Sequence, residues 1–128
     1  MPNEKAPIGS FGWFDLTTNQ AVELKSFYEA VVGWESSDLS MGSYSDYVMS
    51  SPETKAPVAG VCHARGANAE LPPQWLLYVY VKSVEASIKQ CVALGGTVIA
   101  PIRVMEGQGR YCVIQDPAGA VLAIFEQE

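Results

Sequence analysis

One stretch of sequence decides the fold: residues 13–33, WFDLTTNQAVELKSFYEAVVG, which predict a strand, a short polar turn and a helix. A second copy of the pattern, LLYVYVKSVEASIKQCVALGG, occupies residues 76–96, so that every residue lies 63 positions after its mate. Hardly any residues are identical, but both copies have a strand-like run, a polar break, a helical period and a glycine at which the helix must end. An internal repeat of this size predicts two copies of one structural unit.

Each helix has one apolar face at the three-and-four spacing that is typical of residues packed in a core. The members of this face are Ala21, Leu24, Phe27, Tyr28, Val31 and Val32 in the first helix, and Val84, Ile88, Cys91 and Val92 in the second. We therefore expect both faces to be buried. Ser83 is predicted to cap the start of the second helix, and Gly33 and Gly95 or Gly96 to cap the two helix ends.

The rest of the chain supplies strands in the same order after each helix. Strands are expected at residues 11–17, 34–38, 44–50 and 58–64, and again at 75–81, 97–105, 110–115 and 120–126, with a linker at 66–73. The sequence therefore predicts an α+β fold made of two βαβββ modules in tandem, about residues 8–64 and 74–126. We expect one domain over residues 1–128, in which a curled mixed sheet surrounds a cleft and the helices lie outside.

The composition of the chain indicates which partners it can bind and in which cellular compartment it functions. The 128 residues include 14 acidic and 8 basic side chains, a net charge of −6. Nucleic-acid binding needs clustered Lys and Arg, so this balance argues against a nucleic-acid partner. The start of the chain lacks the features of a signal peptide, and no apolar run approaches membrane-spanning length. We expect a cytoplasmic protein without a membrane partner, whose three scattered cysteines are reduced thiols.

The order of the elements is combined with three local motifs: FYEAVVGW at residues 27–34, LGG at 94–96 and DPAGAVLAIFE at 116–126. Together they resemble the vicinal-oxygen-chelate superfamily over residues 8–126. That superfamily includes glyoxalase I, the bleomycin-resistance proteins, the fosfomycin-resistance enzymes and the extradiol dioxygenases. The resemblance implies the two-module fold and, because its modules usually pair within or between chains, a homodimer.

The resemblance also implies where a metal would be held, since metal-dependent members contribute one His or Glu from each of four strands. These positions fall on Trp13, on its mate Leu76, on Ala123 and, within a residue or two, on Gly60. None of these side chains can coordinate a metal. We therefore expect no metal and no cofactor, and no glyoxalase I activity, since that chemistry relies on the metal.

Two titratable residues are candidates for catalysis without a metal. Alternation along the first strand predicts that Phe14 and Leu16 lie beneath the helix and that Trp13 and Asp15 face the cleft. An acid in a strand needs a polar partner, and either an arginine, Arg103 or Arg110, or a ligand would supply one to Asp15. His63 is the only histidine, with an ordinary pKa that suits a general base. The alternative is a structural role for both residues.

Aromatic residues are dense on the strand faces that should line the cleft, as expected of a small-molecule site with a few polar groups. The candidate ligand-binding residues are Trp13, Asp15, Tyr47, Tyr78, Tyr80, Arg110, Ala123 and Phe125. The alternative is that these side chains fill the cleft completely.

Three hypotheses of function follow from these patterns. The first is a metal-independent protein that binds a small, partly aromatic molecule, similar to the bleomycin-resistance proteins. The second is a metal-independent lyase, isomerase or other enzyme that uses Asp15, His63 or a tyrosine. The third is a dimeric structural or regulatory module with a filled cleft.

Overall fold

The computed structural model describes residues 5–128, and this part of the chain contains eight strands and two α-helices in the order βαβββ twice. The predicted α+β fold with two βαβββ modules is confirmed. The first four residues of the predicted domain lie outside the described residues. The chain divides into two compact units, which we call the N-terminal unit (residues 14–75) and the C-terminal unit (residues 76–128 with the segment before residue 14). Within residues 5–128, neither helix is long and apolar enough to cross a membrane.

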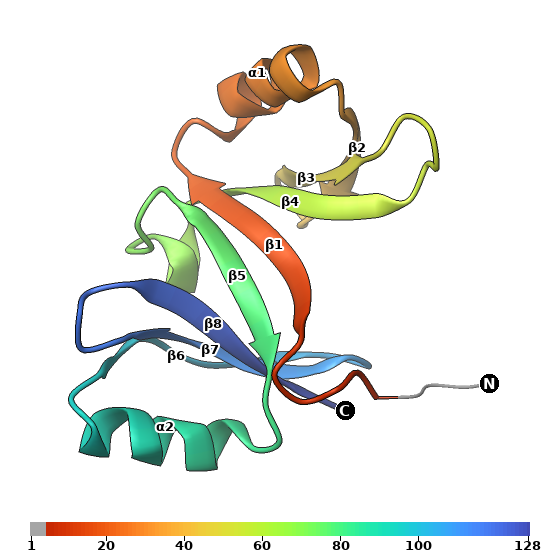
Figure 1. Ribbon diagram of the computed structural model, residues 1–128. Coiled ribbons are helices and arrows are strands. Elements are labelled where there is room, and N and C mark those ends of the chain that lie inside the picture. The colour runs from red at the N-terminus through yellow and green to blue at the C-terminus, as the bar shows by residue number, and fades with distance from the viewer. Residues whose placement is uncertain (1–4) are drawn as a thin grey trace. The chain divides into compact units, whose positions relative to one another are not determined.

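The N-terminal unit has one helix on one face of a four-stranded sheet (Figure 1). Its elements are β1 (Phe11–Thr18), α1 (Ala21–Val32), β2 (Glu35–Ser40), β3 (Ser45–Ser50), β4 (Pro57–His63) and a 3₁₀ turn at Gly66–Asn68. The strand order is β2-β3-β4-β1. Because β1 runs parallel to β4 and the other neighbours are antiparallel, the sheet is mixed, as predicted.

The C-terminal unit repeats this plan, with α2 on one face of its own sheet (Figure 1). Its elements are β5 (Trp75–Tyr80), α2 (Val84–Ala93), β6 (Thr97–Met105), β7 (Gly109–Gln115) and β8 (Val121–Gln127). The strand order is β5-β8-β7-β6, and β5 is parallel to β8. All observed bounds lie within two residues of those expected from the sequence.

The register of the parallel strands repeats with the offset seen in the sequence. Asp15 pairs with Gly60 in the N-terminal unit, and their mates Tyr78 and Ala123 pair in the C-terminal unit. The offset of 63 positions therefore holds for the fourth strand of each module as well as for the first strand and the helix. This agreement supports Gly60 as the mate of Ala123.

The core of each unit lies between the sheet and its helix. Under α1 the buried residues are Ala21, Tyr47, Met49, Ala59 and Val61, and under α2 they are Val84, Cys112 and Ile124. Alternation along the strands gives each sheet a second face, turned away from the helix, which we call the helix-free face.

The prediction that the whole apolar face of α1 is buried is wrong. Phe27, Val31 and Val32 are 52%, 64% and 50% exposed, and only Ala21 of this helix is fully buried. The neighbouring strand β2 has the sequence ESSDLS and is itself mostly exposed, so it offers little apolar surface to cover them. Val92 of α2 is likewise exposed.

Phe14 is also more exposed than expected, at 39%, although Leu16 on the same face is buried. The apolar residues that pack with Ala21 of α1 come from β3 and β4 rather than from the start of β1. Helix α1 therefore leaves Phe14 partly uncovered.

The helix ends follow the sequence closely. The Ser83 hydroxyl accepts a hydrogen bond from the Ala86 backbone N–H at 3.1 Å, as predicted for an N-cap. The Glu126 carboxylate accepts a second one, from the Val84 N–H at 2.9 Å. Gly33 and Gly95 have φ values of 89° and 97°, the left-handed conformation that favours glycine at helix ends. The N-cap of α1, Gln20, forms no side-chain cap.

These two N-caps provide a matched pair of substitutions. Ser83→Ala should lower the free energy of unfolding by about 1 kcal/mol, because it leaves the Ala86 N–H without its side-chain acceptor. Gln20→Ala should change it by much less, because no cap is lost. Denaturant melts of both variants measure the difference, and equal effects would show that the Ser83 cap contributes nothing to stability.

Candidate functional site

The helix-free face of the C-terminal unit is lined with aromatic side chains from three neighbouring strands. Tyr78 and Tyr80 of β5 pair with Ala123 and Phe125 of β8, and Phe125 pairs in turn with Tyr111 of β7. The residues between them on these strands, including Cys112 and Ile124, belong to the core under α2. Strand alternation therefore places all five side chains on the face turned away from the helix. We call Tyr78, Tyr80, Tyr111 and Phe125 the aromatic face.

The four rings form one connected group. Tyr78 and Tyr111 have ring centroids 5.4 Å apart, Tyr80 and Phe125 lie edge to face at 5.9 Å, and Tyr111 stacks on Phe125 at 6.3 Å with an interplanar angle of 8°. Tyr78 and Tyr111 are buried, whereas Tyr80 and Phe125 are half-buried. These separations are those of favourable aromatic pairs, so the rings hold one another in place.

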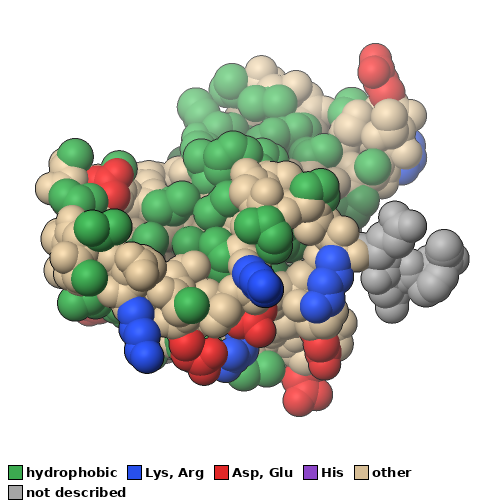
Figure 2. All heavy atoms as spheres, turned by 60° about the horizontal axis from the view of Figure 1, so that its bottom comes forward, with side chains coloured by type: hydrophobic (Ala, Val, Ile, Leu, Met, Phe, Trp, Pro, Cys, Tyr) green, Lys and Arg blue, Asp and Glu red, His purple; other side chains and the backbone are tan. Residues whose placement is uncertain are grey.

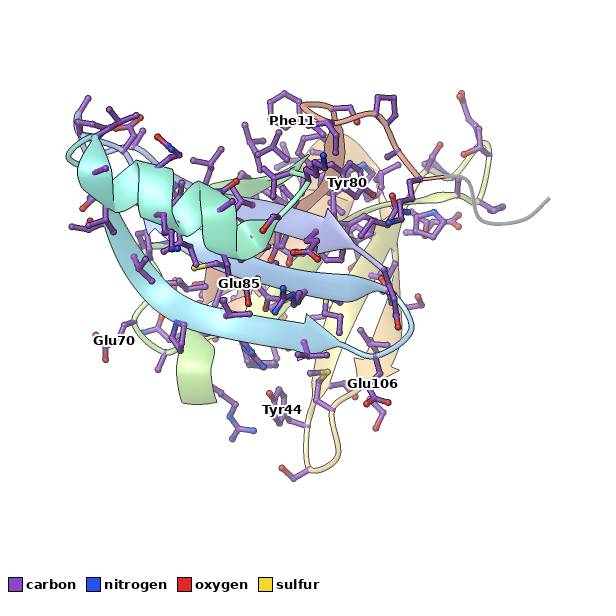
Figure 3. All side chains as sticks on the ribbon, turned by 90° about the horizontal axis from the view of Figure 1, so that it is seen from below. Phe11, Tyr44, Glu70, Tyr80, Glu85 and Glu106 are labelled. Atoms are coloured by element: carbon purple, nitrogen blue, oxygen red, sulfur yellow. The ribbon has the colours of Figure 1, made fainter. Side chains whose placement is uncertain are left out.

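Gly12 fixes the position of Tyr80. The backbone just before Gly12 is joined to β5 through hydrogen bonds from the Gly9 N–H to the Tyr80 carbonyl (2.8 Å) and from the Tyr80 N–H to the Ser10 carbonyl (2.9 Å). A Cβ atom on Gly12 would overlap the Tyr80 ring. Glycine is therefore required here because the ring lies directly against the backbone. Figure 3 labels Tyr80 close to Phe11, the neighbour of Gly12.

Sequence reasoning found Tyr78, Tyr80, Ala123 and Phe125 but missed Tyr111, and it considered Arg103 only as a possible partner of Asp15. Tyr111 lies on a strand whose register with β8 is set by the DPAG turn, so alternation across that turn would have revealed it. Arg103 pairs with Tyr111, and it therefore shares the aromatic face. The pairing of β6 with β7 shifts register between Ala100 and Arg103, which indicates a β-bulge. Because a bulge interrupts the alternation of side chains, the sequence of β6 alone does not predict the face on which Arg103 lies.

The helix-free face of the N-terminal unit is acidic rather than aromatic. The register places Asp15, Cys62 and Thr17 on this face, and Asp46 interacts with Cys62 there. Burial, followed by the charges of Asp15 and Asp46, raises the pKa of the Cys62 thiol far above its ordinary value. Cys62 is therefore held as a neutral thiol, unsuited to nucleophilic attack.

His63 and Asp15 do not form a dyad. The register pairs Asp15 with Gly60 and Thr18 with His63, an odd number of residues further along the strands, so the two side chains lie on opposite faces of the sheet. His63 lies between the rings of Tyr44 and Tyr47, at centroid distances of 5.4 and 6.0 Å. Its backbone N–H donates to the buried Asp46 carboxylate at 2.8 Å.

Tyr47 does not share a face with Asp15, contrary to the sequence-based expectation. It pairs with Val61, clusters with Ala21 of α1 and lies beneath the Lys25 ammonium, 4.9 Å from the ring centroid. The strand containing Tyr47 begins one residue later than predicted. The pairing of β3 with β4 decides on which face of the sheet Tyr47 lies, and the sequence of β3 alone does not predict this pairing. Trp13, the remaining aromatic candidate, is half-buried.

Arg110 lies on the helix side of its sheet, where its contacts are structural. Its guanidinium forms hydrogen bonds with both carboxylate oxygens of Glu85, at 3.0 and 2.5 Å, and lies 3.3 Å from Glu126. The hydrogen bond from Arg110 lowers the pKa of Glu85. Figure 3 shows Glu85 between α2 and the strands beneath it. Figure 2 shows acidic and basic side chains side by side on the face that it presents. A cavity of about 300 Å³ borders Arg110 and the turn at Glu106.

The residues at the expected metal positions do not fit a metal. Trp13, Leu76, Gly60 and Ala123 offer no donor atom on their side chains, and the register confirms Gly60 and Ala123 as mates. Within residues 5–128, no three His, Cys, Asp or Glu side chains are grouped so that they could hold a metal ion.

The sequence is similar to one domain family and to curated proteins over nearly its whole length. The model of the glyoxalase-like domain family matches residues 13–125. The putative glyoxylase CFP32 of Mycobacterium bovis is 31% identical over 119 residues, which are 92% of this chain and 46% of that protein. The anthracycline biosynthesis protein DauV of Streptomyces sp. (strain C5) is 30% identical over 118 residues, 92% of this chain and 42% of that protein. The chain thus spans less than half the length of these curated relatives.

Solved structures show the same fold at low sequence identity. The methylmalonyl-CoA epimerase of Mycobacterium tuberculosis is 12% identical, with 94% of this chain and 88% of that chain covered and a TM-score of 0.57. The Mn(II)-bound glyoxalase of Novosphingobium aromaticivorans is 13% identical, with 93% and 39% covered and a TM-score of 0.57. At these identities the similarity is one of fold.

The lack of metal-coordinating side chains at the four mapped positions leads to a prediction about the metal content of the protein. Protein purified without chelator should contain only substoichiometric zinc, nickel, iron or manganese, because the four mapped positions offer no ligand. Elemental analysis by mass spectrometry before and after dialysis against EDTA measures this. A retained stoichiometric metal that stabilises the fold would contradict the prediction.

Proposed function

The chain belongs to the family of glyoxalase-like domains, and from that premise we propose that it binds a small, partly aromatic molecule without a bound metal. The predicted resemblance to the vicinal-oxygen-chelate superfamily is confirmed by this family match and by the fold neighbours. The proposed ligand surface is the aromatic face of the C-terminal unit.

The arrangement of the aromatic face supports this proposal. Its four rings are held by mutual contacts, and the half-buried Tyr80 and Phe125 present ring surface that a flat ligand can contact. The tyrosine hydroxyls and Arg103 provide polar groups beside it. Small-molecule sites have this composition, with mostly apolar walls and a few oriented polar groups.

The polar candidates support binding rather than acid–base catalysis. Asp15 and His63 lie on opposite faces of their sheet, so a direct proton relay between them is absent. Cys62 is kept protonated by burial and by two neighbouring carboxylates. Catalysis by general acids and bases requires groups within hydrogen-bond reach of a common substrate atom. Binding places no such demand on these residues.

A panel of aromatic probes tests the proposal: an anthracycline, chosen because of the name of the Streptomyces relative, together with indole, 2-naphthol and benzoate. We expect at least one to bind with a dissociation constant of about 100 µM or lower. Tyr80→Leu should weaken that binding about tenfold, since it removes a ring from the face. Isothermal titration calorimetry of the wild type and the variant measures both quantities.

Tyr44→Leu is the matched control, because Tyr44 is a half-buried tyrosine of the N-terminal unit. It should leave the affinity for the same probe unchanged. If no probe binds, or if Tyr44→Leu weakens binding while Tyr80→Leu does not, the proposed ligand surface is wrong.

A further inference from the structure

Three basic side chains gather with two tyrosine rings at one end of the N-terminal unit. The Lys25 ammonium of α1 lies 4.9 Å from the centroid of the Tyr47 ring, and the Arg65 guanidinium lies 4.1 Å from that of Tyr44. The His63 ring lies between the two tyrosines, at centroid distances of 5.4 and 6.0 Å. These contacts connect all five residues, which we call the basic–aromatic cluster.

The basic–aromatic cluster lies at the edge of the sheet from which α1 starts. His63 ends β4 and pairs with Thr18 at the end of the parallel strand β1, and α1 begins shortly afterwards at Ala21 (Figure 1). Tyr47, beneath Lys25, packs in the same core group as Ala21. The cluster is therefore beside the first turns of α1, where the helix dipole favours negative charge.

The basic groups of the cluster have no acceptor within residues 5–128. The Lys25 ammonium, the His63 imidazole and the Arg65 guanidinium form neither an ion pair nor a hydrogen bond there, and their contacts are with the tyrosine rings. Lys25 and His63 are half-buried. An aromatic face attracts a cation without neutralising its charge. The rings thus position these N–H groups and leave them able to donate.

Three acids in this part of the N-terminal unit do not occupy these donors. Asp46 is buried and accepts a hydrogen bond from the His63 backbone N–H at 2.8 Å, and its other interaction is with a thiol on the helix-free face. Glu29 accepts a hydrogen bond from a serine hydroxyl of β2. Asp38 of β2 is exposed and forms no ion pair with Lys25.

The repeat shows that the module does not need basic residues at these positions. At the offset of 63 positions, Lys25, His63 and Arg65 correspond to Ile88, Glu126 and Glu128. The Glu126 carboxylate accepts a hydrogen bond from the Val84 N–H at the start of α2. The C-terminal unit therefore supplies its own carboxylate where the N-terminal unit has His63.

We propose that the basic–aromatic cluster binds a doubly charged oxyanion of the phosphate type. Lys25 and Arg65 provide charged N–H donors, which form the stronger class of hydrogen bonds, and a guanidinium fits two phosphate oxygens at once. The His63 imidazole provides a further N–H group. The cluster belongs to the N-terminal unit and the proposed ligand surface to the C-terminal unit, so this inference does not depend on the proposed function.

Titration with inorganic phosphate at pH 7 and constant ionic strength tests the proposal. Because His63 is the only histidine, its ring resonances can be followed by NMR without further assignment. We expect them to shift saturably, with a dissociation constant on the order of 1 mM. Lys25→Gln and Arg65→Gln should each weaken this binding at least about fivefold, because each removes a charged donor.

Lys89→Gln is the matched control, because it removes one positive charge from an exposed position on α2. It should leave the affinity for phosphate unchanged. Benzoate, a probe of the aromatic face with a single charge, should shift the His63 ring far less than phosphate does. The two proposals can therefore fail separately.

Two results would overturn the proposal. The first is a His63 ring that does not respond to phosphate at about twenty times the expected dissociation constant. The second is a loss of affinity in Lys89→Gln as large as in the other two variants, since that would show general attraction of an anion to positive charge. Arg65 is exposed, so Arg65→Gln remains a folded test even if Lys25→Gln disturbs the packing on Tyr47.

Discussion

The parallel pairing of the first and last strand in each unit is the constraint on which the rest of the structure depends. It aligns Asp15 with Gly60 and, 63 positions later, Tyr78 with Ala123. Because side chains alternate along a strand, a slip of one residue would transfer every side chain of that strand to the opposite face. The same register therefore decides which residues pack beneath each helix and which remain on the helix-free face.

The two units share this register but have different side chains on their helix-free faces. The helix-free face of the C-terminal unit holds connected aromatic rings, whereas that of the N-terminal unit holds two acids beside a neutral thiol. The four positions that would face a metal in metal-dependent members of the superfamily contain no ligand. The fold is thus retained without its metal donors, and we propose that the aromatic side chains recognise a ligand instead. This is why we favour binding over metal-assisted catalysis.

The sequence predicted the elements, the repeat, the helix caps and most of the aromatic face, because these depend on local periodicity and on a constant offset. It did not predict features that depend on how neighbouring strands pair. The pairing with β4 turned Tyr47 toward the helix, and a bulge brought Arg103 to the aromatic face. The spacing of apolar residues in α1 also could not show that the neighbouring strand β2 is too polar to bury Phe27. Arg110 was assigned to a ligand but pairs with Glu85, which alternation along its own strand does not reveal.

The six tyrosines allow a direct test of the central claim, since three lie in each unit. Protein labelled with ¹³C-tyrosine is titrated with the tightest-binding aromatic probe, and the tyrosine ring resonances are followed by NMR. Single Tyr→Phe variants assign each resonance to its residue. The claim predicts that the rings of Tyr78, Tyr80 and Tyr111 shift, and that those of Tyr28, Tyr44 and Tyr47 do not. Saturable shifts confined to the second group would contradict it.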